Sequence, residues 1–86
     1  MEFDWDADKD AANRAKHGVS LGEAVRLDWD RGRDVFDLRA DYGEMRVSRF
    51  AYLDSRLYVC VYIVRNTVLR IISLRKANRR EIRDHG

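Results

Sequence analysis

Arginine and aromatic side chains share one set of alternate positions in the second half of the chain. This set spans three apolar runs, 45–53, 56–65 and 67–75, and comprises Arg46, Ser48, Phe50, Tyr52, Tyr58, Cys60, Tyr62, Arg70 and Ile72. Guanidinium groups bind phosphates, and aromatic rings stack on bases with about 1–3 kcal/mol per base. On one open face of a sheet, these residues would suit single-stranded nucleic acid, with Phe50, Tyr58 and Tyr62 as the stacking residues.

The same positions also fit an ordinary solvent-facing sheet surface. Tyrosine and phenylalanine favour strands, cross-strand aromatic pairs stabilise sheets, and arginine is common on exposed strands, so the pattern leaves both interpretations open. The opposite alternate positions are aliphatic and predict the core, comprising Met45, Val47, Ala51, Leu53, Leu57, Val59, Val61, Ile63, Leu69 and Ile71. Arg49 interrupts this aliphatic set, and a bulge or register error near it would exchange part of the two faces.

Arginine dominates the basic residues of the chain. Fourteen of the 17 basic residues are Arg, which binds phosphate bidentately and stays charged at physiological pH. The last predicted helix spaces its charges by three or four residues, which gives a stripe made of Arg75, Lys76, Arg79, Arg80 and Arg83. A solvated helix face explains such a stripe equally simply, but its position beside the Arg and Tyr set favours nucleic acid.

Charge is segregated along the chain, although the net charge is only +2. Residues 1–44 hold twelve acidic and seven basic residues, a net of −5, whereas residues 45–86 hold three and ten, a net of +7. Such segregation creates local fields of either sign. We predict that the basic half contacts nucleic acid or a partner and that the acidic half forms the back and flank of the domain.

Helix-boundary signals organise the N-terminal part of the chain. Residues 2–5 alternate polar and aromatic side chains, as in a short strand. A helix over 7–17 is predicted, capped by Asp6 or Asp8 and ended by Gly18, which supplies the left-handed conformation that a helix C-terminus often needs.

The remaining elements complete an α+β pattern. Ser20 and Glu23 predict a capping box and a second short helix, residues 34–39 are a strand candidate, and the three apolar runs predict an antiparallel meander that a basic helix over 76–84 follows. We therefore expect one domain over 1–86, with an antiparallel sheet of three to four main strands, two N-terminal helices on one face and a C-terminal basic helix.

Several other functional classes find no support in the sequence. Asp6, Asp8 and Asp10 have the spacing of a calcium loop, but Ala11 stands where the turning glycine is required. The His and Cys spacing makes no zinc site, and the single Cys60 is predicted to be a small core residue. No apolar run approaches the roughly 20 residues of a membrane span. We therefore expect a cytoplasmic protein with no metal, no cofactor and no membrane partner.

Two motifs bracket nearly the whole chain. The first comprises Phe3, Trp5, Asp6, Lys9, Asn13, Lys16-His17-Gly18-Val19-Ser20 and Glu23-Ala24, and the second comprises Arg70-Ile71-Ile72-Ser73, Arg75-Lys76-Ala77, Arg79 and Glu81. Together they resemble the BrnT toxins, a family similar to the RelE and ParE toxins. Residues 27–44 do not align with that family. The family usually carries Tyr and acidic residues after the last basic helix, where this chain has Asp84-His85-Gly86.

The resemblance implies a toxin of a bacterial type II toxin-antitoxin system, with a small RelE-like domain that acts as a metal-independent endoribonuclease and inhibits translation. It also implies neutralisation by a BrnA-like antitoxin, in a complex of two toxins and two antitoxins that binds operator DNA. In the implied reaction, the ribose 2′-hydroxyl attacks the adjacent phosphate. That step needs a base, cations for the crowded phosphorane and an acid for the leaving oxygen.

The matching motifs imply roles for several cationic residues. Arg70 is the expected main phosphate stabiliser, with Arg46 beside it on the open face. Arg75, Lys76 and Arg79 are expected to position the RNA backbone.

His17 is the implied general acid or base, because it matches the Lys-His-Gly motif of the family and histidine is the usual side chain for proton transfer at physiological pH. The alternative is that His17 serves the carbonyl groups and the turn at the end of its helix. Glu81 is a weaker candidate for the base, and an ion pair with a nearby Arg explains it more simply.

Two other functions stay open at this point. One is a non-catalytic module whose basic face binds an acidic protein partner, and the other is a ParE-like inhibitor of DNA gyrase. RNA degradation by the isolated protein separates both of them from a ribonuclease.

Overall fold

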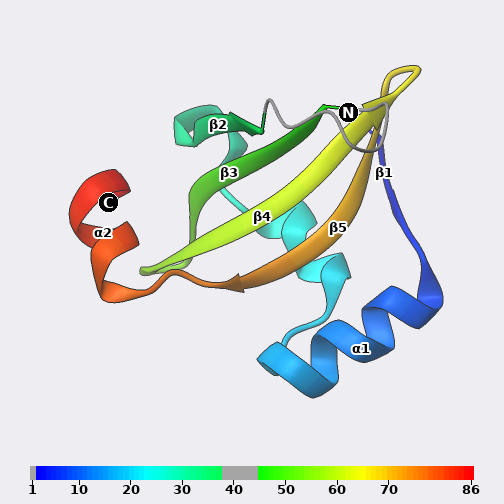
Figure 1. Cartoon of the computed structure of the whole chain (residues 1–86), viewed down its shortest axis with the longest axis horizontal. Coiled ribbons are helices and arrows are strands. Elements are labelled where there is room, and N and C mark those ends of the chain that lie inside the picture. The colour runs from blue at the N-terminus through cyan, green and yellow to red at the C-terminus, as the bar shows by residue number, and fades with distance from the viewer. Residues whose placement is uncertain (1, 38–44) are drawn as a thin grey trace.

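In the part of the chain that the structure describes, five strands form a single sheet, with helices around it (Figure 1). The computed structural model describes residues 2–37 and 45–86. The elements in chain order are β1 (Glu2–Trp5), α1 (Ala7–His17), the 3-10 helices η1 (Leu21–Arg26) and η2 (Trp29–Arg31), β2 (Arg33–Asp37), β3 (Arg46–Leu53), β4 (Arg56–Arg65), β5 (Val68–Lys76) and α2 (Arg79–His85). The strand order is β1-β5-β4-β3-β2, in which β1 runs parallel to β5 and the other neighbours are antiparallel.

The predicted α+β class is confirmed, but the sheet is larger than predicted and it is mixed. The long strands β3, β4 and β5 correspond to the three predicted runs, and β1 and β2 add short strands at the two edges. The expected strand over 34–39 begins at Arg33 and is described only to Asp37. An edge strand finds its place by pairing with distant residues, as Phe3 does with Leu69, and a local pattern does not encode that partner.

Helix α1 has the predicted boundaries. The Asp6 side chain accepts a hydrogen bond from the Lys9 backbone N–H at 3.0 Å. Gly18 adopts a left-handed conformation with φ of 73°, and its N–H donates to the carbonyl of Arg14. The start and the end of α1 are therefore both explained by the residues at its ends.

The expected second helix is a 3-10 helix, η1, and its start differs from the predicted capping box. The Ser20 hydroxyl accepts from the Gly22 N–H at 3.2 Å and donates to Asp10 of α1 at 3.0 Å. Asp10 also accepts from the Leu21 N–H at 2.7 Å, and this hydrogen bond lowers the pKa of the Asp10 carboxyl. The start of η1 is thus tied to α1 rather than to Glu23.

The predicted division of the sheet into two faces is wrong for β4. The turn at Asp54 and Ser55 places Leu53 opposite Arg56. Strand partners share a face, so Leu53 lies on the same side as the even-numbered residues of β4, and not with Leu57 as predicted. A two-residue turn exchanges odd and even positions, and this exchange moves the aromatic residues of β4 into the core.

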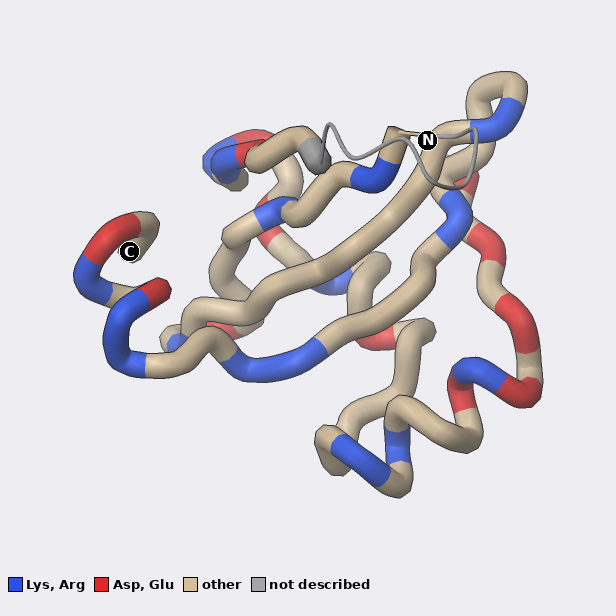
Figure 2. Tube along the Cα trace, viewed as in Figure 1, with Lys and Arg blue, Asp and Glu red and all other residues tan. Residues whose placement is uncertain are grey.

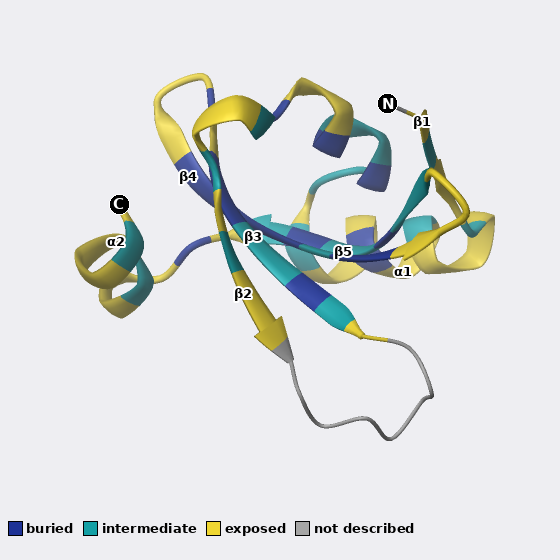
Figure 3. Ribbon diagram, turned by 90° about the horizontal axis from the view of Figure 1, so that it is seen from above, coloured by how far each residue is buried: buried dark blue, intermediate teal, exposed yellow. Residues whose placement is uncertain are grey.

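The main core lies between the sheet and the helices α1 and η1, and Figure 3 shows buried residues on η1 and along β3, β4 and β5. It comprises Leu21, Ala24, Leu27, Val47, Ala51, Leu53, Tyr58, Cys60, Tyr62, Ile71 and Leu74. Tyr58 and Tyr62 are only 9 % and 6 % exposed, so their predicted place on an open face is wrong. Cys60 is buried as predicted, and burial raises the pKa of its thiol to about 12.

Arg49 lies on this helix-covered face without a bulge. Its guanidinium binds Asp34 of β2 bidentately and donates to the Trp29 carbonyl at 2.7 Å, and its Cζ lies 4.9 Å from the Trp29 ring centroid. The Tyr62 hydroxyl donates to the same carboxylate at 3.3 Å. The charge that interrupts the aliphatic pattern is therefore paired. The irregularity of the sheet lies elsewhere, between Val61 and Tyr62 in the pairing of β4 with β5.

Helix α2 is shorter than the predicted basic helix, because Lys76 is the last residue of β5. Its N-terminus carries the capping box that was expected at Ser20. The Asn78 side chain accepts from the Glu81 N–H, and the Glu81 side chain accepts from the Asn78 N–H, each at 2.9 Å. Among the described residues, no helix is long and apolar enough to cross a membrane.

Candidate functional site

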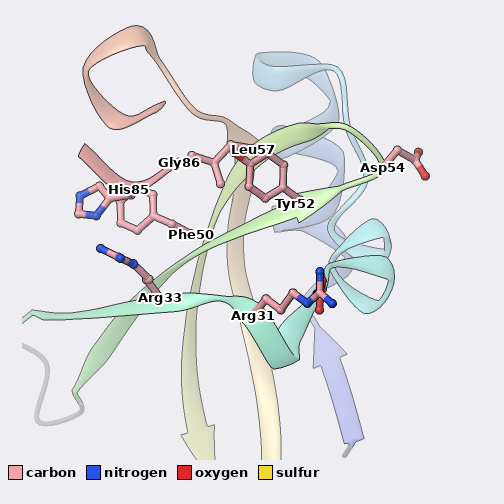
Figure 4. Close-up of a pocket in the computed structure, with 9 residues that line it drawn as sticks. Arg31, Arg33, Phe50, Tyr52, Asp54, Leu57, His85 and Gly86 are labelled. Atoms are coloured by element: carbon pink, nitrogen blue, oxygen red, sulfur yellow. The ribbon is translucent and has the colours of Figure 1, made fainter. Parts of the chain in front are cut away.

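A pocket of about 420 Å³ lies at one end of the sheet, next to α2 (Figure 4). Its lining residues come from η2 and the residue before it, from β2, β3, β4 and the turn between β3 and β4, and from α2 and the residue after it. They are Asp28, Arg31, Arg33, Phe50, Tyr52, Asp54, Leu57, His85 and Gly86. We refer to it below as the His85 pocket. It combines cations, an imidazole, a phenol and carboxylates in one hollow.

One row of strand partners forms the base of this region. Arg33 pairs with Phe50, Phe50 with Val59, and Val59 with Arg75. Partners in a row share a face, so Arg33 and Arg75 flank two apolar residues on the face opposite the main core. The His85 ring stacks on Phe50, with ring centroids 4.0 Å apart and an interplanar angle of 18°.

The two pocket arginines differ in their surroundings. In Figure 4 the Arg33 guanidinium points toward the His85 ring. Arg33 is exposed, and the structure gives it no ion pair with any of the described residues. Arg31 is also exposed and lies near Asp28, with 3.9 Å between Arg31 Nε and the Asp28 carboxylate. Arg33 is therefore the cation most open to a bound anion beside the imidazole.

Hydrogen bonds to the backbone of Ala77 fix the connection from β5 to α2. The Ala77 N–H donates to the Leu57 carbonyl at 3.0 Å, and the Arg56 guanidinium donates to the Ala77 carbonyl at 3.0 Å. Ala77 is 1 % exposed and packs with Phe50, Leu57 and Val59. This small second core secures the start of α2 against the open face.

An ion pair holds α2 one turn further along. Arg75 donates to both carboxylate oxygens of Glu81, at 2.7 and 2.8 Å. Glu81 lies four residues before His85, one helical turn away. The ion pair and the second core together set where His85 stands, so Glu81 is an ion-pair partner, as the simpler interpretation expected.

We expect acid to remove the stabilisation from this ion pair. Hydrogen bonds from Arg75 hold the pKa of Glu81 at about 2, below its ordinary value of 4.5. Because the folded pKa is the lower one, the stabilisation is complete above about pH 4.5 and is lost as the pH falls toward 2. Glu81→Gln should cost roughly 1 kcal/mol at neutral pH, since Arg75 is partly exposed to solvent. Urea denaturation at pH 7 and pH 3 measures both quantities.

Asp84→Asn is the matched control for Glu81→Gln. Asp84 is in the same helix, its side chain is 51 % exposed, and it lies 3.5 Å from Arg83. The control should change stability little at either pH. The difference in stability between pH 7 and pH 3 should be smaller for Glu81→Gln than for the wild type, and equal differences would contradict this assignment.

Arg70 and Arg46, the expected phosphate-binding pair, lie outside the His85 pocket. Arg70 pairs in register with Ile63, four residues along β4 from Val59, which is about 13 Å at 3.3 Å per residue. Its guanidinium lies 3.2 Å from the Asp4 carboxylate. Arg46 begins β3 on the far side of β4 and pairs in register with Asp37 of β2. The structure therefore puts them on one face but not side by side, and separates both from His85.

Of the other predicted site residues, Phe50 alone is among the described residues that line the His85 pocket. His17 lies in a different groove, beside Lys9 and Lys16 of α1. Arg75 is engaged by Glu81. Two further residues expected to bind the backbone, Lys76 and Arg79, are exposed. Phe50 is 7 % exposed, and its ring stacks on His85, so base stacking would require His85 to move.

Sequence reasoning missed the residues that define the pocket. The sequence analysis considered His85 only in excluding a zinc site, although its spacing of four from Glu81 already placed both on one face of the last helix. Arg33 could not be found from its spacing, because it lies within residues 27–44, where neither quoted motif falls, and it meets Phe50 only through strand pairing. Arg31 belongs to η2, which the sequence did not predict, whereas Tyr52 was already in the predicted arginine and aromatic set.

Comparison with known proteins gives one family match. A family model described as a ribonuclease toxin, BrnT, of a type II toxin-antitoxin system matches residues 5–81, which is most of the 86-residue chain. His85 lies just beyond the matched segment. No curated protein matches the chain. Within residues 2–37 and 45–86, no group of three or more His, Cys, Asp or Glu side chains is arranged to hold a metal ion.

Proposed function

The chain belongs to the BrnT family of ribonuclease toxins of type II toxin-antitoxin systems, and on that premise we propose that it cleaves RNA in the His85 pocket without a metal ion. One observation carries the choice of this pocket, which is the imidazole of His85 beside the exposed Arg33 in a hollow of about 420 Å³. An imidazole can transfer a proton near neutral pH, and guanidinium groups stabilise phosphate charge.

The proposed reaction is an internal transesterification. The ribose 2′-oxygen forms a bond to the adjacent phosphorus, and the bond from phosphorus to the 5′-oxygen breaks. His85 takes the proton from the 2′-hydroxyl, and the Tyr52 hydroxyl gives a proton to the leaving 5′-oxygen. Tyr52 is 42 % exposed and lines the same pocket. A Cβ added to Gly86 would lie 3.3 Å from the Tyr52 hydroxyl, so the phenol adjoins the residue after His85.

The pocket arginines supply the charge that this reaction needs. A pentavalent phosphorane carries more negative charge on its oxygens than the ground-state diester, and fixed cations beside it lower the barrier. Arg33 lies next to His85 and is assigned to the phosphate, with Arg31 at the far side of the pocket. Arg75 acts indirectly in this proposal, by holding Glu81 and therefore α2.

We propose a RelE-type toxin of the cytoplasm that inhibits translation by cutting RNA. A BrnA-like antitoxin would neutralise it by covering the basic open face, in a complex of two toxins and two antitoxins that binds operator DNA. The exposed Arg33, and the exposed cations at the end of β5 and the start of α2, support contact with a polyanion or an acidic segment on this side of the molecule.

We expect the purified protein to cleave labelled RNA in the presence of excess chelator. The products should carry 2′,3′-cyclic phosphate and 5′-hydroxyl ends, because the ribose hydroxyl is the nucleophile. Gel analysis of end-labelled RNA, with treatment of the products by phosphatase and kinase, checks both points. A co-purified cognate antitoxin should suppress the cleavage.

Three results would contradict the proposed function. Loss of cleavage on chelation would make the reaction metal-dependent. Intact RNA together with inhibited DNA gyrase would favour a ParE-like activity. Intact RNA together with tight binding of an acidic protein would favour a non-catalytic module.

A further inference from the structure

A second hollow, of about 210 Å³, lies between α1 and the edge of β5, away from the His85 pocket. Its lining residues are Lys9, Ala12, Asn13, Lys16, His17, Ile72 and Ser73, and none of them lines the His85 pocket. We refer to it as the α1–β5 groove. It offers two ammonium groups, an imidazole and a hydroxyl, and none of the described residues that line it carries a carboxylate.

The groove exists because β1 covers only half of the β5 edge. β1 pairs with Val68 to Ile71, and α1 lies beside the remainder. Asn13 holds it there, because its side-chain amide donates to the Leu74 carbonyl at 2.8 Å and accepts from the Leu74 N–H at 3.2 Å. Ile72 and Ser73 lie between the last residue that pairs with β1, Ile71, and the residue that Asn13 binds, and they form the β5 side of the groove.

The cations of α1 lie on the helix face that borders the groove. Lys9, Asn13, Lys16 and His17 occur at positions i, i+4, i+7 and i+8, which share one face of a helix. Since Asn13 is bound to the edge of β5, the same face directs the two lysines toward the groove. No ion pair with the described residues engages Lys9 or Lys16, so both remain available to an external anion.

Positive charge continues from this groove toward the His85 pocket. Ser73 is three residues before Lys76, which is about 10 Å along the strand, and α2 starts at Arg79. Figure 2 shows basic segments at the end of β5, between those on α1 and those on α2. Arg75 and Lys76 are on opposite faces of β5. Arg75 is paired with Glu81, whereas Lys76 is exposed, so Lys76 is the cation that a polyanion passing round this edge meets.

We infer that the α1–β5 groove binds a phosphodiester of the RNA substrate outside the bond that is cleaved, so that the substrate is an extended single strand rather than a short oligonucleotide. This inference rests on the proposed function. Ammonium, imidazole and hydroxyl donors are the groups that proteins use to position a nucleic-acid backbone without reading its sequence. A single phosphate matches a small cationic hollow better than a protein segment does, because a docked segment needs a longer surface.

The test compares Lys9→Ala/Lys16→Ala with the wild type on two substrates. Both lysines are exposed, so the variant should fold, and circular dichroism checks this. With an RNA of about 20 nucleotides, KM should rise about tenfold while kcat stays within twofold. With a dinucleotide, neither should change. Arg14→Ala/Arg26→Ala removes the same charge from the acidic half of the chain, outside the groove, and should behave as the wild type.

Equilibrium binding of uncleavable, 2′-deoxy-substituted RNA gives a readout that does not depend on catalysis. The plot of log K against log salt should be shallower for the lysine variant, by about 0.7 for each phosphate that its side chains no longer neutralise. Unchanged KM and slope would overturn the inference. Weakened antitoxin binding with unchanged RNA binding would assign the groove to the partner protein instead. If the wild type cleaves no RNA but the salt slope still differs, the proposed function fails and the groove stands.

Discussion

His85→Ala should reduce RNA cleavage by about 10²- to 10⁴-fold, the range for loss of a residue that transfers a proton in the transition state. The imidazole is assigned this role because it lines the pocket together with Arg33 and is fixed by stacking on Phe50 at 4.0 Å. Initial rates on a dinucleotide at saturating concentration report the chemical step alone. KM should change little, because the ring is not assigned to bind the phosphate.

His17→Ala is the matched control, since it removes the only other histidine of the chain. His17 lies in the α1–β5 groove, so its loss should leave dinucleotide cleavage within about twofold of the wild type. The two arginines are compared in the same way. Arg33→Ala should lower the rate of dinucleotide cleavage about 10²-fold, whereas its control, Arg70→Ala, should lower it only slightly. The opposite result, in which His17 and Arg70 are required and His85 and Arg33 are not, would return the active site to the residues that the family motifs imply.

The elements of this fold are largely predictable because their signals are local. Asp6 and Gly18 bound α1 through contacts within a few residues, and the three apolar runs became β3, β4 and β5 with shifts of one residue at most. The relation between neighbouring strands was not predictable from alternation alone. One two-residue turn decided whether Tyr58 and Tyr62 faced the helices or the solvent, and alternation within a strand contains no information on that choice.

The candidate site was less predictable than the fold, because it depends on which charges are already neutralised. Arg49, Arg70 and Arg75 belong to the basic half of the sequence, but each faces a carboxylate in the structure. Arg33 comes from the acidic half and is open to an anion. The net charge of a segment therefore indicates where an anion can bind only after the arginines that form ion pairs with neighbouring carboxylates are discounted.

Asn13→Ala should lower the free energy of unfolding by about 3 kcal/mol, a large part of the roughly 4–13 kcal/mol expected for a chain of this length. Asn13 is 6 % exposed, and it is the one buried polar or charged residue among those described. Its amide group makes two hydrogen bonds with the Leu74 backbone and donates to the Val19 carbonyl at 2.9 Å. Alanine would leave the Leu74 N–H and carbonyl buried without partners and would release α1 from the edge of β5. Urea denaturation at neutral pH measures the change.

Two further variants separate this role from the general effect of losing an amide. Asn78→Ala removes an exposed N-cap amide and should cost only about 1 kcal/mol. Asn13→Asp keeps the acceptor for the Leu74 N–H but places a carboxylate against two carbonyl oxygens, so it should be at least as damaging as alanine at neutral pH. Burial raises the pKa of such a carboxyl, and its neutral form can donate again, so part of the lost stability should return as the pH falls. A cost below about 1 kcal/mol for Asn13→Ala, or an Asn13→Asp variant as stable as the wild type at neutral pH, would show that the backbone of β5 does not depend on this side chain.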